Sequence, residues 1–245
     1  MTAAHAVPPT PGTLRAFSAA TRMEWIKLRS LRSSWWTLAA TIAGAAGIAV
    51  AVGANTKDAS ADVTNNLLAG VAPGLLLIGA LGVLTMTGEY SSGMVRATLA
   101  AVPSRPLLLA AKAAVFGAVT LAVAEVTAFV AFLAGRAALP DRIPSPGLGQ
   151  PEVLRAVVLS GVGIALIGLF GLGLGAVIRH SAAALAVYAG LVFVAGQLLY
   201  ALAATAVEYV PLALVSDSVG VTRHEAGALS PWAGLGMLGL YAALT

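Results

Sequence analysis

Residues 156–178 read AVVLSGVGIALIGLFGLGLGAVI and contain no charged side chain. An α-helix rises 1.5 Å per residue, so this stretch would be about 34 Å long, enough to cross a bilayer hydrocarbon core of about 30 Å. Backbone polar groups find no water in hydrocarbon, and a helix satisfies all of them internally. The stretch therefore predicts a membrane-spanning helix.

Comparable apolar runs occupy most of the chain. Four are clear and a fifth is short: 35–54, 67–87, 113–133, 182–204 and 231–245. The last would reach only about 22 Å as a helix, so we expect it to be truncated. Of the 245 residues, 59% are hydrophobic and 10% are charged, against about 25% charged in ordinary soluble domains. We predict an all-α polytopic membrane protein with six transmembrane helices, forming one domain over 13–245 after a disordered N-terminus at 1–12.

Basic residues are concentrated between alternate runs, and cytoplasmic loops of membrane proteins carry the excess of Lys and Arg. The best assignment puts the N-terminus in the cytoplasm. It places most of the 14 basic residues there: Arg15, Arg22, Lys27, Arg29, Arg32, Arg96, Arg105, Lys112 and Arg179. These residues lie in separate segments and form no continuous basic face, so nucleic-acid binding is not expected.

The segment before the first run has a helical pattern of its own, over 14–34. Apolar residues fall on one side, whereas Arg15, Arg22 and Arg29 recur every seven residues on the other. This pattern predicts an amphipathic helix at the cytoplasmic membrane surface. Its expected interfacial anchors are Trp25, Arg29, Trp35 and Trp36. The alternative is a basic flank that only sets the topology.

The loop between the second and third runs is longer than a turn requires. Gly88 and Gly93 would permit a sharp exit from the membrane, and residues 94–101 can form a short amphipathic helix that Pro103 and Pro106 end. Such a helix could transmit a push from a soluble partner. The alternative is a polar hairpin without a partner.

The succession of these features resembles the type-2 ABC transporter permeases of bacteria. It consists of Glu24-Trp25-Ile26-Lys27-Leu28-Arg29, two spans, Gly88-Glu89-Tyr90 with Gly93, Thr98-Leu99, Pro103-Ser104-Arg105, Lys112, and four further spans. The resemblance covers nearly the whole chain.

This resemblance implies a multi-pass subunit of a bacterial cytoplasmic (inner) membrane exporter. It implies a second permease copy or homologue and two ABC ATPase subunits, which would bind ATP and Mg. It also implies that the loop after the second span docks the ATPase as a coupling helix. The residues expected to take part in docking or coupling are Glu89, Tyr90, Arg96, Thr98 and Arg105.

No motif for catalysis is visible. The sequence has no phosphate-binding loop, no His-Glu-x-x-His, no nucleophile elbow and no cysteine, so we expect neither an enzyme nor a metal site. ATP hydrolysis would belong to the separate partner. The glycines at 168, 171, 173 and 175 lie inside an apolar span, where small residues favour close helix packing rather than a dinucleotide loop.

Two polar residues lie inside predicted spans. Glu125 is about halfway along the third, and Gln197 is midway along the fifth. Placing a charge at the bilayer centre costs at least about 2.5–3.5 kcal/mol, so Glu125 should not face lipid. Each residue could line a substrate path, or could form a polar contact between helices, for instance between Glu125 and Gln197 or Thr120.

The outer segment over 207–230 has two interpretations. Its apolar residues, including Val210 and Leu214, could form a re-entrant helix, with Arg223, His224 and Glu225 returning to water. The alternative is an ordinary outer loop.

Taken together, the sequence predicts a permease subunit that exports an amphipathic or lipid-like substrate, such as a drug, antibiotic, peptide or lipid. Transport would proceed by alternating access at the seam of a permease dimer. The alternative function is a membrane scaffold or sensor that recruits a cytoplasmic partner without transport.

Overall fold

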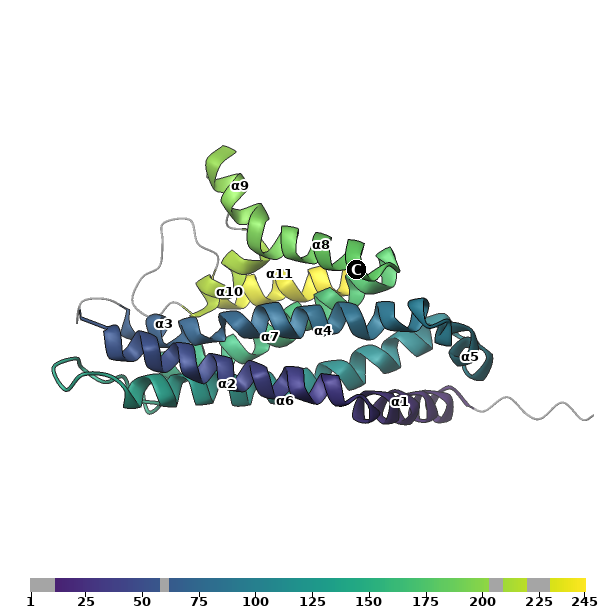
Figure 1. Cartoon of the computed structure of the whole chain (residues 1–245), viewed down its shortest axis with the longest axis horizontal. Coiled ribbons are helices and arrows are strands. Elements are labelled where there is room, and N and C mark those ends of the chain that lie inside the picture. The colour runs from purple at the N-terminus through teal and green to yellow at the C-terminus, as the bar shows by residue number, and fades with distance from the viewer. Residues whose placement is uncertain (1–11, 58–61, 203–208, 220–229) are drawn as a thin grey trace, which may run out of the picture.

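The computed structural model describes residues 12–57, 62–202, 209–219 and 230–245, and every regular element in these residues is a helix. Most of the predicted N-terminal disordered segment, 1–12, therefore lies outside the described residues. The longest helices run side by side along the long axis of the molecule, with α8, α10 and α11 against one side of them (Figure 1).

Five helices are long and apolar enough to cross a membrane, and they cover the five clear runs. Their bounds are α2 (Arg32–Asn55), the continuous segment α3 (Val63–Leu68), η1 (Ala69–Val71) and α4 (Ala72–Ser91), α6 (Arg105–Ala137), α7 (Pro151–Ile178), and α8 (Ser181–Ala189) continued by η2 (Gly190–Val194) and α9 (Ala195–Leu202). A shorter apolar helix, α11 (Pro231–Leu244), occupies the sixth run. Six spans therefore remain a prediction.

The N-terminal region forms α1 (Thr13–Ser30), which ends four residues before the expected bound of residue 34. Leu31 has an extended backbone, with φ −85° and ψ 100°, so the chain turns there before α2 begins. Trp35 and Trp36 consequently belong to α2. The position of α1 at a membrane surface stays a prediction.

The helix expected after the second span is present as α5 (Met94–Ala101). Gly93 makes the turn into it with φ 71°, a left-handed conformation that costs glycine little. Gly88 has no such role, because α4 continues through it to Ser91. Figure 1 shows α5 and α1 at the same end of the bundle.

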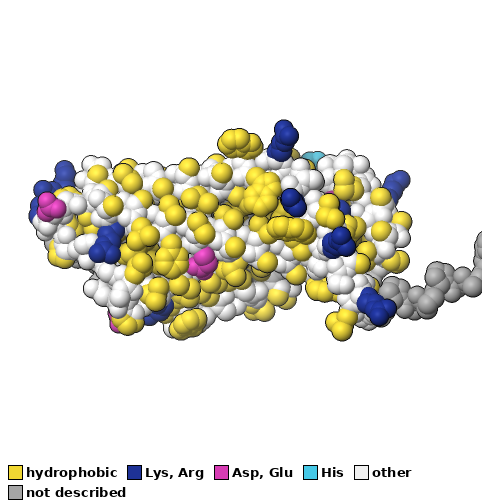
Figure 2. Space-filling view, turned by 90° about the horizontal axis from the view of Figure 1, so that it is seen from below, with side chains coloured by type: hydrophobic (Ala, Val, Ile, Leu, Met, Phe, Trp, Pro, Cys, Tyr) yellow, Lys and Arg dark blue, Asp and Glu magenta, His cyan; other side chains and the backbone are white. Residues whose placement is uncertain are grey.

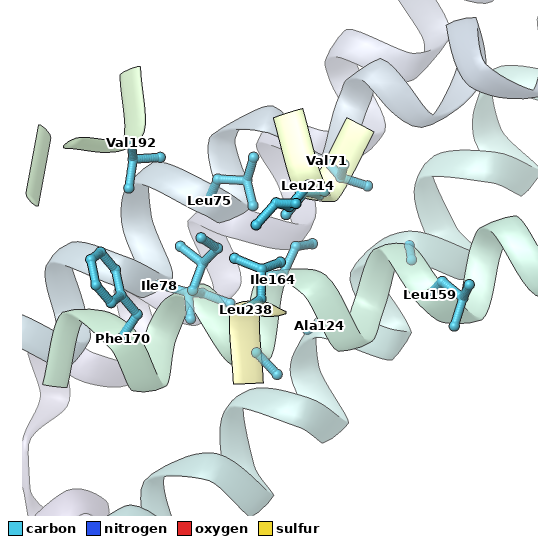
Figure 3. Packing of buried hydrophobic residues seen from close by; sticks show 14 of the residues in the cluster. Val71, Leu75, Ile78, Ala124, Leu159, Ile164, Phe170, Val192, Leu214 and Leu238 are labelled. Atoms are coloured by element: carbon cyan, nitrogen blue, oxygen red, sulfur yellow. The ribbon is translucent and has the colours of Figure 1, made fainter. Parts of the chain in front are cut away.

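The core forms mainly where α4 packs on α7. Side chains from several helices come together there, including Ile78, Ile164, Leu214 and Leu238 (Figure 3). The buried members of this cluster are aliphatic and aromatic side chains. It therefore holds the helices together by shape and dispersion contacts.

Glycines let α4 and α7 approach closely. A methyl group on Gly171 would overlap the carbonyl oxygen of Gly79, and one on Gly175 would lie 2.8 Å from the carbonyl oxygen of Val83. A methyl group on Gly168 would lie 2.8 Å from the Ile78 side chain of α4, and one on Gly173 would overlap the Thr245 hydroxyl at the end of α11. The expectation that these four glycines serve helix packing is confirmed.

The α8–α9 segment is bound less closely. Tyr188 of α8 is buried against Gly79, and its hydroxyl donates a hydrogen bond to the carbonyl oxygen of Leu75. After the π-helical turn η2, no residue of α9 is buried. Figure 1 shows α9 leaning away from the bundle.

The outer segment is described only in part. Arg223, His224 and Glu225 lie outside the described residues, whereas α10 (Pro211–Val219) is present. Val210 and Leu214 are buried there, and α10 packs against α7 and α11. Whether this segment dips into a membrane stays a prediction.

Candidate functional site

Charged side chains from three helices meet at the end of the bundle that carries α5. They are Glu24 and Lys27 of α1, Glu89 of α4 and Lys112 of α6. Thr98 of α5 joins them through its hydroxyl. We call these five residues the charged cluster.

The sequence places Glu24 in the cluster through the helical repeat of α1. Ala20, Glu24 and Leu28 are spaced four apart, so they lie on one face of the helix, and they are its buried residues. This face packs on α6, the helix that carries Lys112. The exposed face of α1 carries Arg22 and Arg29.

Each lysine of the cluster bridges both glutamates. The Lys27 Nζ donates to Glu24 Oε1 and Glu89 Oε1, at 2.9 Å each. The Lys112 Nζ donates to Glu89 Oε1 at 2.7 Å and forms a short ion pair with Glu24 Oε2. Two positive charges therefore balance two negative ones, and the pairs tie together three helices that lie far apart in sequence.

Thr98 connects α5 to the cluster. Its hydroxyl accepts a hydrogen bond from Lys27 Nζ at 3.1 Å and donates to the carbonyl oxygen of Met94 at 3.1 Å. Thr98 is the buried residue of α5. Movement of α5 would therefore disturb Lys27 directly.

The cluster is nearly closed to solvent. Lys112 is 3% exposed, Glu24 is 4% and Glu89 is 8%. Charges buried this deeply are costly unless paired, and removal of one partner from a buried pair typically costs 3–5 kcal/mol. The pairing therefore matters more for the arrangement of the helices than a surface salt bridge would.

Lys27 lies at the edge of the cluster and is partly exposed. Burial by itself would lower the pKa of its ammonium group, but hydrogen bonds to Glu24 and Glu89, and their negative charges, outweigh that effect and raise the pKa above the ordinary value of 10.5. Lys27 therefore stays charged throughout the physiological pH range.

The five residues predicted for docking or coupling divide into two groups. Glu89 and Thr98 are buried within the charged cluster. Arg96 and Arg105 are exposed, and Tyr90 is half-buried with the Arg179 guanidinium 5.6 Å from its ring centre. A soluble partner could touch the exposed group, whereas the buried pair could act only by holding helices in place.

Two cavities share the Glu89–Lys112 pair in their lining. One, of about 330 Å³, also reaches Glu24 and Lys27. The other, of about 320 Å³, is bounded by α4, α5 and the facing ends of α6 and α7, with Arg105 and Arg179 in its wall. Lys112 borders both.

Glu125 and Gln197, the polar residues inside spans, do not share a site. The Glu125 carboxyl group lies against α7. A methyl group on Gly161 of that helix would be 2.6 Å from the Glu125 Cδ. Gln197 is exposed on α9. The Thr120 hydroxyl donates to the carbonyl oxygen of Phe116 at 2.8 Å, within its own helix.

Figure 2 shows a largely hydrophobic surface along the middle of one face, with an acidic side chain within it.

The predicted interfacial anchors are all on the surface. Trp25, Trp35 and Trp36 are 41%, 43% and 76% exposed, and Arg29 is exposed beside them. The Trp35 indole donates to the carbonyl oxygen of Arg29 at 3.3 Å, which connects α2 to the end of α1. The exposed rings leave the anchor prediction open.

Reasoning from sequence did not select Glu24, Lys27 or Lys112 as site residues. One signal was available, because Glu24 and Glu89 are the two acids on the otherwise basic side assigned to the cytoplasm. Only the contacts between helices identify the members of the charged cluster.

Among the described residues, no three His, Cys, Asp or Glu side chains gather closely enough to hold a metal ion.

Comparison with models of known protein families gives no match, and comparison with curated proteins gives no significant match.

Proposed function

We propose that the chain is the membrane-spanning subunit of an ATP-driven exporter, and that the charged cluster couples a separate cytoplasmic ATPase to the membrane helices. The supports are the resemblance of the sequence to type-2 ABC permeases and the presence of five apolar helices with a short helix, α5, at one end. The observation that carries the proposal is the cluster, which connects α5 to α1, α4 and α6.

Coupling requires a solid connection between the surface that is pushed and the helices that move. The exposed side of α5, including Arg96, would receive the partner. On its buried side, Thr98 contacts Lys27, which is paired with Glu89 on α4. Because Glu89 also pairs with Lys112, displacement of α5 would be transmitted to α4 and α6 together.

The cargo best suited to these helices is amphipathic or lipid-like. The five spans are predominantly apolar, with Glu125 near the middle of α6. An ion or a strongly charged metabolite would need more polar partners at membrane depth. A second copy of the chain would provide the other side of the transport path.

The proposal is tested by purifying the full-length chain from its native host in mild conditions, identifying what accompanies it and measuring ATP hydrolysis. We expect a stoichiometric ATPase. Arg96→Glu should weaken its association by reversing a charge on the exposed face of α5, while insertion stays normal. Arg142→Glu makes the same change at an exposed position beyond the far end of α6 and should have no effect.

Two results would contradict the exporter. If no ATPase accompanies the chain under conditions that preserve membrane complexes, the partner is missing. If another cytoplasmic protein binds through Arg96 and no ATP turnover follows, the chain is a scaffold or sensor instead. Equal losses for Arg96→Glu and Arg142→Glu would contradict α5 as the docking element.

A further inference from the structure

A second feature of the same end of the bundle concerns the cavity of about 320 Å³ between α4, α5, α6 and α7. Four charged residues line it: Glu89, Lys112, Arg105 and Arg179. Glu89 and Lys112 are partners in the charged cluster, which is neutral as a whole. The two arginines are therefore the excess charge of the cavity.

Neither arginine has an acidic partner among the residues that the structure describes. The Arg179 Nε donates to the carbonyl oxygen of Ala176 at 3.3 Å, and its guanidinium lies over the ring of Tyr90. Arg105 is exposed at the first turn of α6. Two cations that border one cavity repel each other, so an anion between them would be stabilised.

The backbone adds to this attraction. Arg105 and Pro106 begin α6, and Ser104 at its N-cap provides no side-chain hydrogen bond to the free amides of the first turn. The N-terminus of a helix carries partial positive charge and favours phosphate groups. The cavity thus has two arginines in its lining and is bordered by the first turn of α6.

Its remaining wall is apolar. Val95 and Leu99 of α5 and Leu108 and Leu109 of α6 line the cavity, and Leu109 is 37% exposed on the outer surface. Leu108 and Leu109 lie near the start of α6, a helix long and apolar enough to cross a membrane, so in a bilayer this wall would be close to the level of the lipid headgroups. Basic pockets between helices at this depth bind anionic lipid headgroups.

We propose that this cavity binds the phosphate of an anionic phospholipid, with Arg105 and Arg179 on the phosphate and the leucines against the start of an acyl chain. The occupant would lie between α5 and α7, so it would stiffen the contact of α5 with the bundle. This site does not depend on the exporter proposal, because it requires only that the bundle is in a membrane.

The probe is phosphatidylglycerol, with phosphatidylcholine as the uncharged comparison. The full chain is purified in detergent, exposed to an equimolar mixture of the two lipids, and retained lipid is counted by native mass spectrometry. We expect one phosphatidylglycerol to be retained in preference. Arg105→Gln and Arg179→Gln should each lower its apparent affinity about fivefold, and the double variant about 25-fold if the effects add.

Matched variants separate this site from general attraction and from misfolding. Arg96→Gln removes a neighbouring positive charge that does not line the cavity and should leave retention unchanged. Replacing both arginines by lysine keeps the charge and should preserve most of the binding. We expect the double lysine variant to bind the lipid nearly as well as the native chain, and the double glutamine variant to lose binding. If both variants have the same helix content, the loss is due to the missing charge in the cavity.

Inorganic phosphate distinguishes the source of the anion. Millimolar phosphate should compete weakly, because it lacks the contact with the apolar wall. The lipid site would be overturned by equal retention of both lipids, by unchanged retention in the double glutamine variant, or by phosphate binding without lipid selectivity. If the cavity instead binds an acidic side chain of a docked protein, lipid retention should be the same with and without the two arginines.

Discussion

The helices α4 and α9 are both apolar, yet the protein holds them very differently. Glycines bring α4 against α7, and its last turn carries Glu89 into the charged cluster. By contrast, α9 has no buried residue, and Leu198 and Leu202 are 58% and 74% exposed. Hydrophobicity therefore marks both helices as membrane segments, whereas small residues and paired charges decide which one is fixed.

The largest effect should come from breaking the charged cluster at the end of α4. Lys112→Met would leave Glu24 and Glu89 buried with only Lys27 between them, and we expect a loss of about 3–5 kcal/mol in the free energy of unfolding. The measurement is unfolding by SDS in mixed micelles. Lys57→Met removes an exposed charge at the end of α2 and should change little.

A double-mutant cycle sharpens this test. Glu24→Gln in the background of Lys112→Met should restore part of the stability, because it removes the one negative charge that Lys27 cannot balance. Strict additivity of the two losses would show that Glu24 and Lys112 are not coupled.

The next largest effect should come from the seam between α4 and α7. Gly171→Ala introduces a methyl group that would overlap the Gly79 carbonyl oxygen, so the two backbones must separate. We expect the free energy of unfolding to fall by about 2–3 kcal/mol. The same substitution at Gly190, where α8 meets η2, encounters nothing within 4 Å and should be neutral or slightly stabilising. If both substitutions lowered the free energy of unfolding by similar amounts in the same micelles, the proposed contrast between the α4–α7 seam and the α8–α9 segment would be wrong.

Tyr188 is one of the last buried residues before α9, with Val192 in η2 after it. Tyr188→Phe removes the hydrogen bond to the Leu75 carbonyl oxygen but keeps the ring, so we expect a loss of about 1 kcal/mol. Amide hydrogen exchange should become faster in α8, whereas its rate in α7 should stay the same. An unaltered α8 would mean that ring packing alone holds this helix.

The smallest effect should be on α9. Leu198→Ala should change the free energy of unfolding by less than about 0.5 kcal/mol, because the side chain leaves an exposed position rather than a packed one. A loss greater than about 1 kcal/mol in the isolated chain would show that α9 packs against protein in solution.

Much of the fold follows from composition and local pattern. The uncharged runs located five helices long and apolar enough to cross a membrane, because a bilayer demands about 20 apolar residues from each helix. The short helix over 94–101 and the packing role of Gly168, Gly171, Gly173 and Gly175 were also visible in sequence. The break at Leu31 was not, since an extended residue between two good helices has no local signal there.

The site was predictable only in part. Glu89 and Thr98 were selected through the resemblance to permeases, but their burial, and their contacts with Lys27, depend on helices that begin far apart in the chain. Likewise, nothing local distinguishes Arg179, which lies beside Tyr90 because α7 ends next to α4.

The sequence by itself determined where five helices able to cross a bilayer run, because transfer of apolar residues to hydrocarbon is a sum over local segments. The tertiary structure alone decided which charges are paired. Ion pairs depend on distances of a few ångströms between separate helices, so Glu24, Glu89, Lys27 and Lys112 became one neutral cluster while Arg105 and Arg179 were left facing a shared cavity.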